Sequence, residues 1–527
     1  MRPLGAQISH MLKDRGAEVI FGIPGVHNQE MYRGIEEAGL RHVLARHEQG
    51  AGFMADGYAR ASGKPGVCYV ITGPGVCNIL TPMGQAFSDS VPMLVIASAL
   101  DETAARRGQL HQMLDQRAAA ATVCTVAEEA RTAQAAYALI DRALAGFVTA
   151  RPRPAYVQVP IACLGASAPE APAAAAPADR PRAGDPAFHA ALRAICAARK
   201  PVFLFGGGAR GGAAAIPSIL AHTGAASFCT AAARGLVPPD APLYCGATMA
   251  RGESAALLAR ADLVVAVGTE LAETDIWRDD LGHRCPMLRV DLDPAVLGDA
   301  APDDLCVLAD AGAFLKALAI ALPARDAPHA PAWDTDEIRA FRARARASVE
   351  ADYPGTLPAI DALRGCLPND VMIYSDMTQF AYAALEVWDM ARPGHWHHPF
   401  GFGTLGYALP AAIGGAVARP GLPTLAIAGD YGFQYTVNEL ATAVELGLPL
   451  PILLWDNGKL GAIEASMIRA QIAPNAVIAR NPDFGRLAES YGALSAAPGS
   501  LDEMGQAVRA AFHADRPTVI RVTPELR

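Results

Sequence analysis

Apolar runs alternate with amphipathic stretches towards the C-terminal end of the chain. Residues 424–429 (TLAIAG) form a continuous apolar run that predicts a buried strand. Residues 436–447 (TVNELATAVELG) have the composition and spacing of a helix, and residues 449–455 (PLPILLW) form a second buried run. A strand, a helix and a strand in this order predict a parallel unit, in which both strands end at the same edge of the sheet.

The same alternation of strand and helix recurs in the rest of the chain. It is predicted again in residues 1–22, 71–98, 200–212 and 261–277. In several of these segments a glycine-rich turn follows the strand, as in many α/β proteins. The sequence therefore predicts an α/β protein built from doubly wound parallel sheets.

Two stretches without periodicity divide the chain. Residues 165–187 and 323–336 are rich in alanine and proline, and we interpret them as stiff linkers. They separate three predicted doubly wound domains, at residues 1–165, 186–323 and 350–527. A chain of 527 residues is long enough for three such domains, each with its own core.

Charge and composition exclude some classes of function. The formal net charge is −9, and no basic cluster indicates a nucleic-acid-binding protein. No run of 18 or more apolar residues predicts a membrane span, and the N-terminal segment lacks the pattern of a signal peptide. The ten cysteines are scattered, so we interpret them as small buried residues in a reducing cytoplasm.

Asp430 and Asn457 carry the clearest chemistry in the sequence. Asp430 directly follows the first of the two C-terminal apolar runs, and Asn457 closely follows the second. Both are therefore expected at one edge of the sheet. Mg²⁺ prefers oxygen ligands and usually shares them with phosphate. A carboxylate at Asp430, an amide oxygen at Asn457 and the backbone carbonyl of Lys459 could hold this ion. The alternative is that Asp430 is an ordinary loop residue.

This segment resembles the cofactor motif of the thiamine diphosphate-dependent decarboxylase and acetolactate synthase superfamily. The usual motif is Gly-Asp-Gly, a helix-bearing spacer and Asn-Asn. Gly429 and Asp430 match it, whereas Tyr431 replaces the last glycine and Asp456 replaces the first asparagine. The resemblance implies that Asp430, Asn457 and Lys459 bind Mg²⁺, and that Gly429, Tyr431 and Gly432 lie against the diphosphate.

Residues 46–60 (RHEQGAGFMADGYAR) resemble the segment that carries the catalytic carboxylate of this superfamily. The resemblance implies that Glu48 binds N1′ of the coenzyme's pyrimidine and so activates the coenzyme for proton transfer. Positioned proton transfers of this kind contribute about 100- to 10,000-fold in rate. The alternative is that Glu48 only stabilises the start of a helix through the helix dipole.

Further segments resemble cofactor-binding parts of the same superfamily. They are FGIPGVHNQE, the Gly-Pro-Gly turn of residues 71–98, SDMTQF and GFGTLGYALPAAIGGA. In the last of these, the resemblance implies that Leu405 supports the bent coenzyme and that the Gly403 carbonyl accepts a hydrogen bond from its amino group. The cofactor contacts implied by the other segments are Gly25, Val26, Pro74, Asn78 and Gln379.

The substrate-facing residues are less clearly marked. The resemblance places His27 near the reacting end of the coenzyme, with His111 and Gln112 in a segment above it. Each histidine, His398 included, has the alternative of a neutral ring that is satisfied by a backbone partner. Glu464 could bind a cationic substrate tail, but a carboxylate on a surface helix is the more ordinary interpretation.

The leading functional prediction is non-oxidative decarboxylation of a 2-oxo acid to an aldehyde. The motifs most resemble those of 5-guanidino-2-oxopentanoate (2-ketoarginine) decarboxylases, although Gln112 stands where such an enzyme could be expected to have a carboxylate. A carboligase or lyase of the acetolactate synthase or benzaldehyde lyase type is the alternative, and a non-catalytic scaffold is a third. FAD in the central domain is possible but not favoured over a structural turn at GGGARGG.

The resemblance also predicts the assembly of the protein. It implies a homodimer or homotetramer in which Glu48 of one subunit faces Asp430 and Leu405 of another. The three predicted domains would then bind the pyrimidine (residues 1–165), form the centre (186–323) and bind the diphosphate (350–527). A small-molecule substrate is expected, with neither a nucleic acid nor a membrane as a partner.

Overall fold

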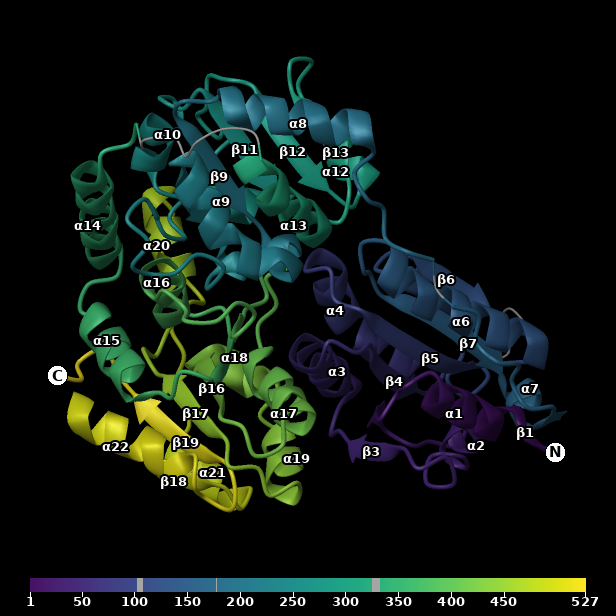
Figure 1. Ribbon diagram of the computed structural model, residues 1–527. Coiled ribbons are helices and arrows are strands. Elements are labelled where there is room, and N and C mark those ends of the chain that lie inside the picture. Colours follow the sequence, from purple (N-terminus) through teal and green to yellow (C-terminus); the bar gives the residue numbers. More distant parts are fainter. Residues whose placement is uncertain (102–107, 177, 325–331) are drawn as a thin grey trace. The chain divides into compact units, whose positions relative to one another are not determined.

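A computed structural model describes residues 1–101, 108–176, 178–324 and 332–527. The chain forms two compact units, which are described separately (Figure 1). The first unit comprises residues 1–178, 371–378 and 398–526, and the second comprises residues 179–370, 379–397 and 527. In the described residues, the first unit contains two large sheets and a small two-stranded one, and the second contains one large sheet.

The N-terminal sheet of the first unit is fully parallel, with the strand order β3-β2-β4-β5-β7-β6. Its strands are β2 (Val19–Gly22), β3 (Arg41–Leu44), β4 (Gly66–Val70), β5 (Met93–Ala99), β6 (Val126–Glu129) and β7 (Ala155–Pro160). Its helices are α1 (Leu4–Asp14), α2 (Gln29–Tyr32), α3 (Glu48–Ser62), α4 (Pro74–Ser88), α5 (Gln116–Ala120), α6 (Ala133–Thr149) and α7 (Ile161–Gly165). The two-residue strands β1 (Arg2–Pro3) and β8 (Ser167–Ala168) pair antiparallel beside it.

Alternate residues of these strands enter two different cores, as expected for a sheet that is covered on both faces. In β5, Leu94 and Ile96 pack with α1 and α6, whereas Met93 and Val95 pack with α3 and α4. The doubly wound prediction for this part of the chain is confirmed.

The C-terminal sheet of the first unit has parallel strands in the order β14-β16-β17-β19-β18. Its strands are β14 (Met372–Ser375), β16 (Thr424–Gly429), β17 (Pro451–Trp455), β18 (Leu494–Ala496) and β19 (Thr518–Val522). Its helices are α17 (Ala408–Ala418), α18 (Asp430–Tyr435), α19 (Glu439–Glu445), α20 (Gly461–Arg469), α21 (Phe484–Ser490) and α22 (Leu501–Ala511).

The two predicted strands at the C-terminal end are β16 and β17. The helix predicted at residues 436–447 is present as α19, and a second short helix, α18, precedes it. Thr436, between the two helices, has a φ of −134° and donates its hydroxyl to the carbonyl of Gly406. Asp430 therefore opens a helix and does not lie in a glycine turn.

One hydrophobic core joins the two sheets of the first unit, and α3 packs against α17 at its centre (Figure 1). Their backbones approach so closely that a Cβ at Gly57 would lie 1.9 Å from the Ala411 carbonyl oxygen. A Cβ at Gly414 would lie 1.9 Å from the Met54 carbonyl oxygen. Glycine is required at both positions because a methyl group would overlap the facing backbone.

The second unit is built on a parallel sheet with the order β10-β9-β11-β12-β13. Its strands are β9 (Pro201–Phe205), β10 (Ala226–Cys229), β11 (Leu263–Val267), β12 (Met287–Asp291) and β13 (Leu305–Leu308), with the short strand β15 (Trp396–His397) elsewhere in the unit. Its helices are α8 (Asp185–Ala197), α9 (Ile216–Thr223), α10 (Gly252–Leu258), α11 (Glu273–Ile276), α12 (Pro294–Gly298), α13 (Ala311–Ala321), α14 (Thr335–Asp352), α15 (Leu357–Cys366) and α16 (Gln379–Val387). Three 3₁₀ segments, η1 (Gly207–Ala215), η2 (Ala231–Ala233) and η3 (Leu322–Ala324), complete it.

Three sequence predictions outside the sheets have mixed outcomes. Residues 165–187 are largely irregular, although they include β8 and the start of α8, and residue 177 lies outside the described part. In the second linker, residues 325–331 also lie outside the described part.

All ten cysteines are free thiols, but the prediction that they are buried holds fully for only four of them, Cys68, Cys124, Cys229 and Cys245. No helix in the described part of the chain is long and apolar enough to cross a membrane.

Candidate active site

Glu48 is the first residue of α3, and its side chain is 8% exposed. Asn78, in the first turns of α4, donates its side-chain amide to Oε2 of Glu48 at 2.9 Å. Gly75, the second residue of α4, leaves room for this carboxylate, because a Cβ there would lie 3.2 Å from Oε1. Pro74 is the first residue of α4. The structure thus brings Glu48 and Asn78 together and fixes one carboxylate oxygen.

The loop after β2 carries Gly25, Val26 and His27. The Gly25 amide donates to Oδ1 of Asn28 at 2.7 Å, and the Asn28 side chain donates back to the Ile23 carbonyl. Val26 is 63% exposed, which is unusual for valine. The helix α2 begins at Gln29, so His27 lies in the turn that precedes it.

His27 and His111 form a ring pair. Their ring centroids are 4.9 Å apart in an edge-to-face arrangement. Nδ1 of each ring is buried and has no hydrogen-bond partner among the described residues. Burial lowers the pKa of His27, and the nearby His111 lowers it further. A neutral His27 ring is therefore favoured at neutral pH.

His111 has a left-handed backbone, with a φ of 63°. This conformation is uncommon for a residue with a side chain and is held by its surroundings. The His111 carbonyl packs against Gly73, where a Cβ would lie 2.4 Å from the carbonyl oxygen. Gln112 is in the same turn, and its Oε1 accepts the Gln109 amide at 3.0 Å.

On the C-terminal sheet, the segment before α17 is held by two neighbouring loops. The Gly406 amide donates to Oδ2 of Asp376 at 2.8 Å, and the Gly406 carbonyl accepts from Thr436 at 2.8 Å. Gly403 and Gly406 have φ values of 64° and 84°, which favour glycine. Leu405, half-buried, lies between these two glycines. Its position is therefore fixed on both sides by backbone contacts.

Asp376 also constrains α18, the helix that begins at Asp430. A Cβ at Gly432 would lie 2.3 Å from Oδ2 of Asp376, so only glycine fits there. Burial raises the pKa of Asp376 to about 6, against the effect of several backbone amides that donate to it. Gly429 is the residue before α18, and Tyr431 is half-buried in its first turn.

Asp430 is 3% exposed and shares a partner with Asp456. The Asn481 side-chain amide donates to Oδ2 of Asp430 at 2.7 Å and to Oδ1 of Asp456 at 2.9 Å. Burial raises the pKa of Asp430, and the charge of Asp456 raises it further. Arg521 on β19 donates to Oδ2 of Asp456 at 2.6 Å, which accounts for the acidic residue that replaces the usual asparagine.

The segment that follows Asp456 is fixed by backbone bonds. The Lys459 amide donates to Oδ1 of Asn457 at 3.2 Å, and Leu460 pairs with Val477. The Lys459 side chain forms an ion pair with Glu464 at 2.7 Å. Glu464 therefore has an internal cationic partner, as expected for an ordinary helix carboxylate.

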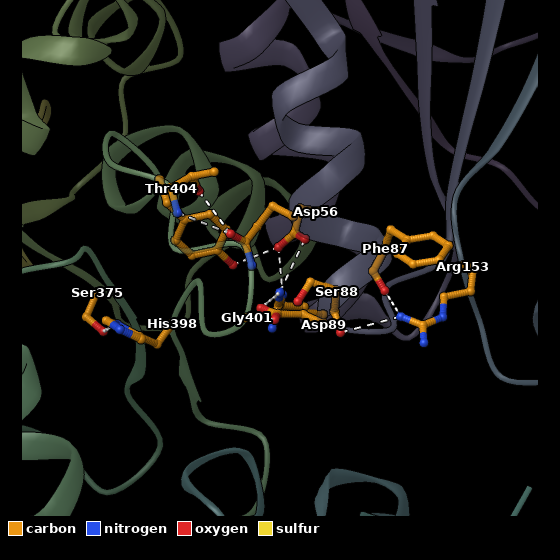
Figure 2. Close-up of polar contacts among 12 residues, drawn as sticks. Asp56, Phe87, Ser88, Asp89, Arg153, Ser375, His398, Gly401 and Thr404 are labelled. Carbon is orange, nitrogen blue, oxygen red and sulfur yellow. Dashed lines mark hydrogen bonds and ion pairs between the residues drawn. The ribbon is translucent and has the colours of Figure 1, made fainter. Parts of the chain in front are cut away.

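A buried ionic network connects α3 and α4 to the segment before α17 (Figure 2). Arg60 lies between Asp56 and Asp89, with N–O distances of 2.6 and 2.8 Å. The Tyr407 hydroxyl donates to Asp56 at 2.7 Å, and Gly401 donates its amide to Asp89 at 3.4 Å. The network anchors both ends of the segment that contains Leu405.

His398 and Gln379 are two further residues that were singled out in the sequence. His398 is buried, and its Nδ1 is 3.0 Å from the Ser375 hydroxyl, which supports the interpretation of a satisfied histidine (Figure 2). Gln379 is the first residue of α16 and belongs to the second unit.

The glycine-rich turn after β9 forms the 3₁₀ segment η1. A Cβ at Gly206 would lie 2.1 Å from the Gly268 carbonyl oxygen. This glycine therefore has a packing role, in keeping with the favoured interpretation of a structural turn, and FAD binding stays the less favoured alternative.

Several residues of the site escaped sequence reasoning. They are Asn481, Arg521, Asp376 and the network of Asp56, Arg60 and Asp89. Asp56, Arg60, Asp89 and Asp376 stand in segments that were noted for other residues, whereas Asn481 and Arg521 stand in no motif. Each reaches the site only through tertiary packing. The Asp456 departure from the usual motif was the one indication that a compensating cation was needed nearby.

Three segments of the chain match domains of known proteins. Residues 2–119 and 376–522 match the N-terminal and C-terminal TPP binding domains of thiamine pyrophosphate enzymes, and residues 188–318 match their central domain. The chain is 43% identical to the probable 2-ketoarginine decarboxylase AruI of Pseudomonas aeruginosa, over 98% of this chain and 93% of that protein.

Acetolactate synthases are more distant relatives. The chain is 28% identical to the large subunit of acetolactate synthase isozyme 2 of Escherichia coli, over 98% of this chain and 95% of that protein. It is 30% identical to the acetolactate synthase large subunit of Corynebacterium glutamicum, over 98% and 86% of the two chains. With matching domains across the sheets and a relative of this similarity, the chain belongs to the thiamine pyrophosphate enzyme family.

Proposed function

We propose that this enzyme catalyses the thiamine diphosphate- and Mg²⁺-dependent, non-oxidative decarboxylation of a 2-oxo acid to an aldehyde. The observation that carries the proposal is the buried Glu48 carboxylate, with one oxygen held by Asn78 at 2.9 Å, in a chain of this family. The 43% identity to a protein named as a probable 2-ketoarginine decarboxylase supports the same reaction class.

The residues around Asp430 suit a divalent cation. Asp430 is a nearly fully buried carboxylate whose pKa is raised by burial and by the charge of Asp456. A cation at this carboxylate would offset both effects, because it favours the ionised form. Asp430, the Asn457 side chain and the Lys459 carbonyl would supply oxygen ligands of the kind that Mg²⁺ prefers.

The proposed function also assigns tasks to Glu48, Leu405, Gly403 and His27. Glu48 would accept a hydrogen bond from the pyrimidine, Leu405 would support the bent coenzyme, and Gly403 would accept from its amino group. When bound, thiamine diphosphate supplies the electron sink that makes loss of the carboxylate as CO₂ feasible. His27, neutral at neutral pH, is suited to accept a proton at its unpartnered Nδ1 and to return it during product formation.

The proposal includes a homodimer or homotetramer with the active site between subunits. Glu48 of one subunit would face Asp430 and Leu405 of another. Within a single chain, Glu48 bonds to Asn78 whereas Asp430 bonds to Asn481, so each half is organised by its own neighbours. Two-fold pairing is the commonest symmetry for soluble oligomers.

The test is to incubate the purified protein with thiamine diphosphate, Mg²⁺ and a panel of 2-oxo acids. The panel contains pyruvate, branched-chain and aromatic acids, and 5-guanidino-2-oxopentanoate, and both CO₂ and the organic product are identified. We expect CO₂ with the matching aldehyde, and loss of CO₂ release when Mg²⁺ is chelated. No CO₂ from any member would contradict the proposal.

A carboligase of the acetolactate synthase type is the second candidate, favoured by the 28–30% identical relatives. It predicts CO₂ together with a longer 2-hydroxyketone. A flavin absorbance in the purified protein would support FAD in the central domain and this second candidate.

A further inference from the structure

Glu439 is a buried carboxylate that the proposed function does not use. It is the first residue of α19, its side chain is fully buried, and it lies on the part of the chain that carries Asp430. Burying a carboxylate is costly unless hydrogen bonds compensate for the lost water. The partners of Glu439 therefore indicate what this carboxylate does.

These partners include the backbone that leads into α3. Glu439 accepts the Arg46 amide at 3.0 and 3.1 Å and the His47 amide at 3.0 Å. Thr442 donates to it at 2.8 Å and Asn438 at 3.2 Å, so the carboxylate oxygens are well supplied with donors. Arg46 and His47 immediately precede Glu48, and His47 is the N-cap of α3.

The first turn of α3 is shaped to receive Glu439. A Cβ at Gly50 would lie 2.1 Å from Oε1 of Glu439, so any side chain at this position would displace the carboxylate. The Glu439 carboxylate and Gly50 thus form a complementary contact beside the residue that carries the chemistry.

We propose that Glu439 is a positioning residue for Glu48. By binding the two amides before Glu48, it fixes where α3 begins and hence where the Glu48 carboxylate lies. This inference rests on the role of Glu48 in the proposed function. A shift of about 1 Å at a reacting group can lower the rate about 100-fold, so control of the helix start has a kinetic effect.

The test compares Glu439→Gln with a matched control, Glu445→Gln. Glu445, at the end of the same helix, forms an ion pair with the Arg46 side chain and does not contact the backbone amides. An amide at position 439 keeps the size of the side chain but replaces one acceptor oxygen with a donor. Glu439→Asp keeps the charge and serves as the conservative variant.

The first readout is hydrogen exchange of the Arg46 and His47 amides in the full-length protein. We expect exchange at these two amides to accelerate at least 10-fold in Glu439→Gln, with no change in Glu445→Gln. Unchanged exchange in Glu439→Gln would overturn the inference, whatever reaction the enzyme catalyses.

The second readout is kinetic, at pH 8. We expect Glu439→Gln to lower kcat about 10- to 100-fold with little change in KM, and Glu439→Asp to recover part of the loss. In a Glu48→Gln background the same substitution should cost less than 3-fold, because its effect passes through Glu48. An equal loss in both backgrounds would overturn the positioning role.

A third readout separates this inference from the proposed function. Exchange of the C2 proton of bound thiamine diphosphate with D₂O requires no 2-oxo acid. We expect Glu439→Gln to slow this exchange about 10-fold or more, while Glu445→Gln leaves it unchanged. If the wild type exchanges the proton but decarboxylates nothing, the proposed function fails and the positioning role is still decided by this comparison.

Discussion

At the scale of single residues, Glu48 has the most specific chemical role in the proposal. Replacing it with glutamine keeps the shape and the contact with Asn78 but removes the negative charge. We expect Glu48→Gln to lower turnover by about 100- to 10,000-fold, with the fold unchanged. Steady-state CO₂ release and far-UV circular dichroism measure the two effects. Turnover equal to that of the wild type would exclude Glu48 as the activating carboxylate.

Asp456 and Arg521 form an ion pair, and we expect substitutions of the two residues to have coupled effects on stability. Asp456 is 8% exposed, so removing the Arg521 guanidinium leaves a buried carboxylate with Asn481 as its remaining side-chain donor. We expect Arg521→Gln to reduce the free energy of unfolding by about 1–2 kcal/mol, less than for a fully buried pair because the Arg521 side chain is partly exposed.

Adding Asp456→Asn should restore most of that stability, because the neutral amide needs no cation. The control is Arg516→Gln, which breaks an exposed ion pair with Asp515 and should have no measurable effect. Urea denaturation of five proteins decides the matter: the wild type, Arg521→Gln, Asp456→Asn, the double variant and Arg516→Gln. Additive losses in the double variant would show that the two residues are not coupled.

Glu439 gives stability a particular dependence on pH. Burial raises its pKa from 4.5 to about 7. Between these values the folded protein keeps a proton that the unfolded chain has released, so this residue lowers stability as the pH rises. In the wild type, this residue should lower the free energy of unfolding by roughly 3 kcal/mol between pH 4.5 and 7. We expect this decrease to be absent in Glu439→Gln.

The measurement is the difference between wild-type and variant unfolding curves at several pH values. Taking the difference cancels the contributions of other carboxyl groups whose pKa is raised by burial, such as Asp376 (about 6), Asp430 and Asp89. A difference that stays constant from pH 5 to 8 would contradict the prediction.

The site residues that could be predicted from the sequence stand in local patterns, whereas those that could not depend on partners far away in the chain. Glu48, Asp430 and the glycines stand in ordered local patterns, and the family match and the parallel sheets confirm the class of protein they indicated. Asn481 and Glu439 belong to no local pattern, because their roles depend on residues 25 or more positions away. Such roles become visible only when the tertiary contacts are known.

At the scale of elements, the contact of α3 with α17 depends on glycine. We expect Gly57→Ala to reduce the free energy of unfolding by about 1–3 kcal/mol, because the new methyl group would overlap the Ala411 carbonyl. Gly146→Ala in α6 is the matched control, since nothing lies within 4 Å of its added Cβ. This control should stabilise the protein by about 0.4–1 kcal/mol.

Thermal unfolding of both variants gives the comparison. If Gly57→Ala and Gly146→Ala shift the midpoint in the same direction, the close backbone approach does not determine the stability of the first unit. At this same scale the helix predicted at residues 436–447 is present as α19. Periodicity did not reveal the short helix α18 before it, or the hydrogen bond from the Thr436 hydroxyl to the Gly406 carbonyl between the two helices.

At the scale of the whole molecule, the proposed assembly can be tested by complementation. Glu48→Gln and Asp430→Asn each inactivate every site of their own homodimer. If each site combines Glu48 of one subunit with Asp430 of the other, a mixed dimer has one intact site. Co-expression of both variants in equal amounts should then recover about a quarter of wild-type activity.

The control is to mix the two purified variants without allowing the subunits to exchange, which should recover nothing. Absence of recovery after confirmed subunit mixing would place both residues in a site formed by a single chain. That result would also contradict the expectation that Glu48 of one subunit faces Leu405 of another.

The contact of α3 with α17 also has a consequence for biosynthesis. Asp56 and Tyr407, which bond across it, are 351 positions apart in the chain. At about 5–20 residues per second, α17 is synthesised roughly 20–70 s after α3. During that interval the narrow glycine surface of α3 and the buried ions Asp56 and Arg60 lack the partners that later cover them. The nascent N-terminal half is thus expected to need protection from a chaperone until the ribosome has nearly completed the protein.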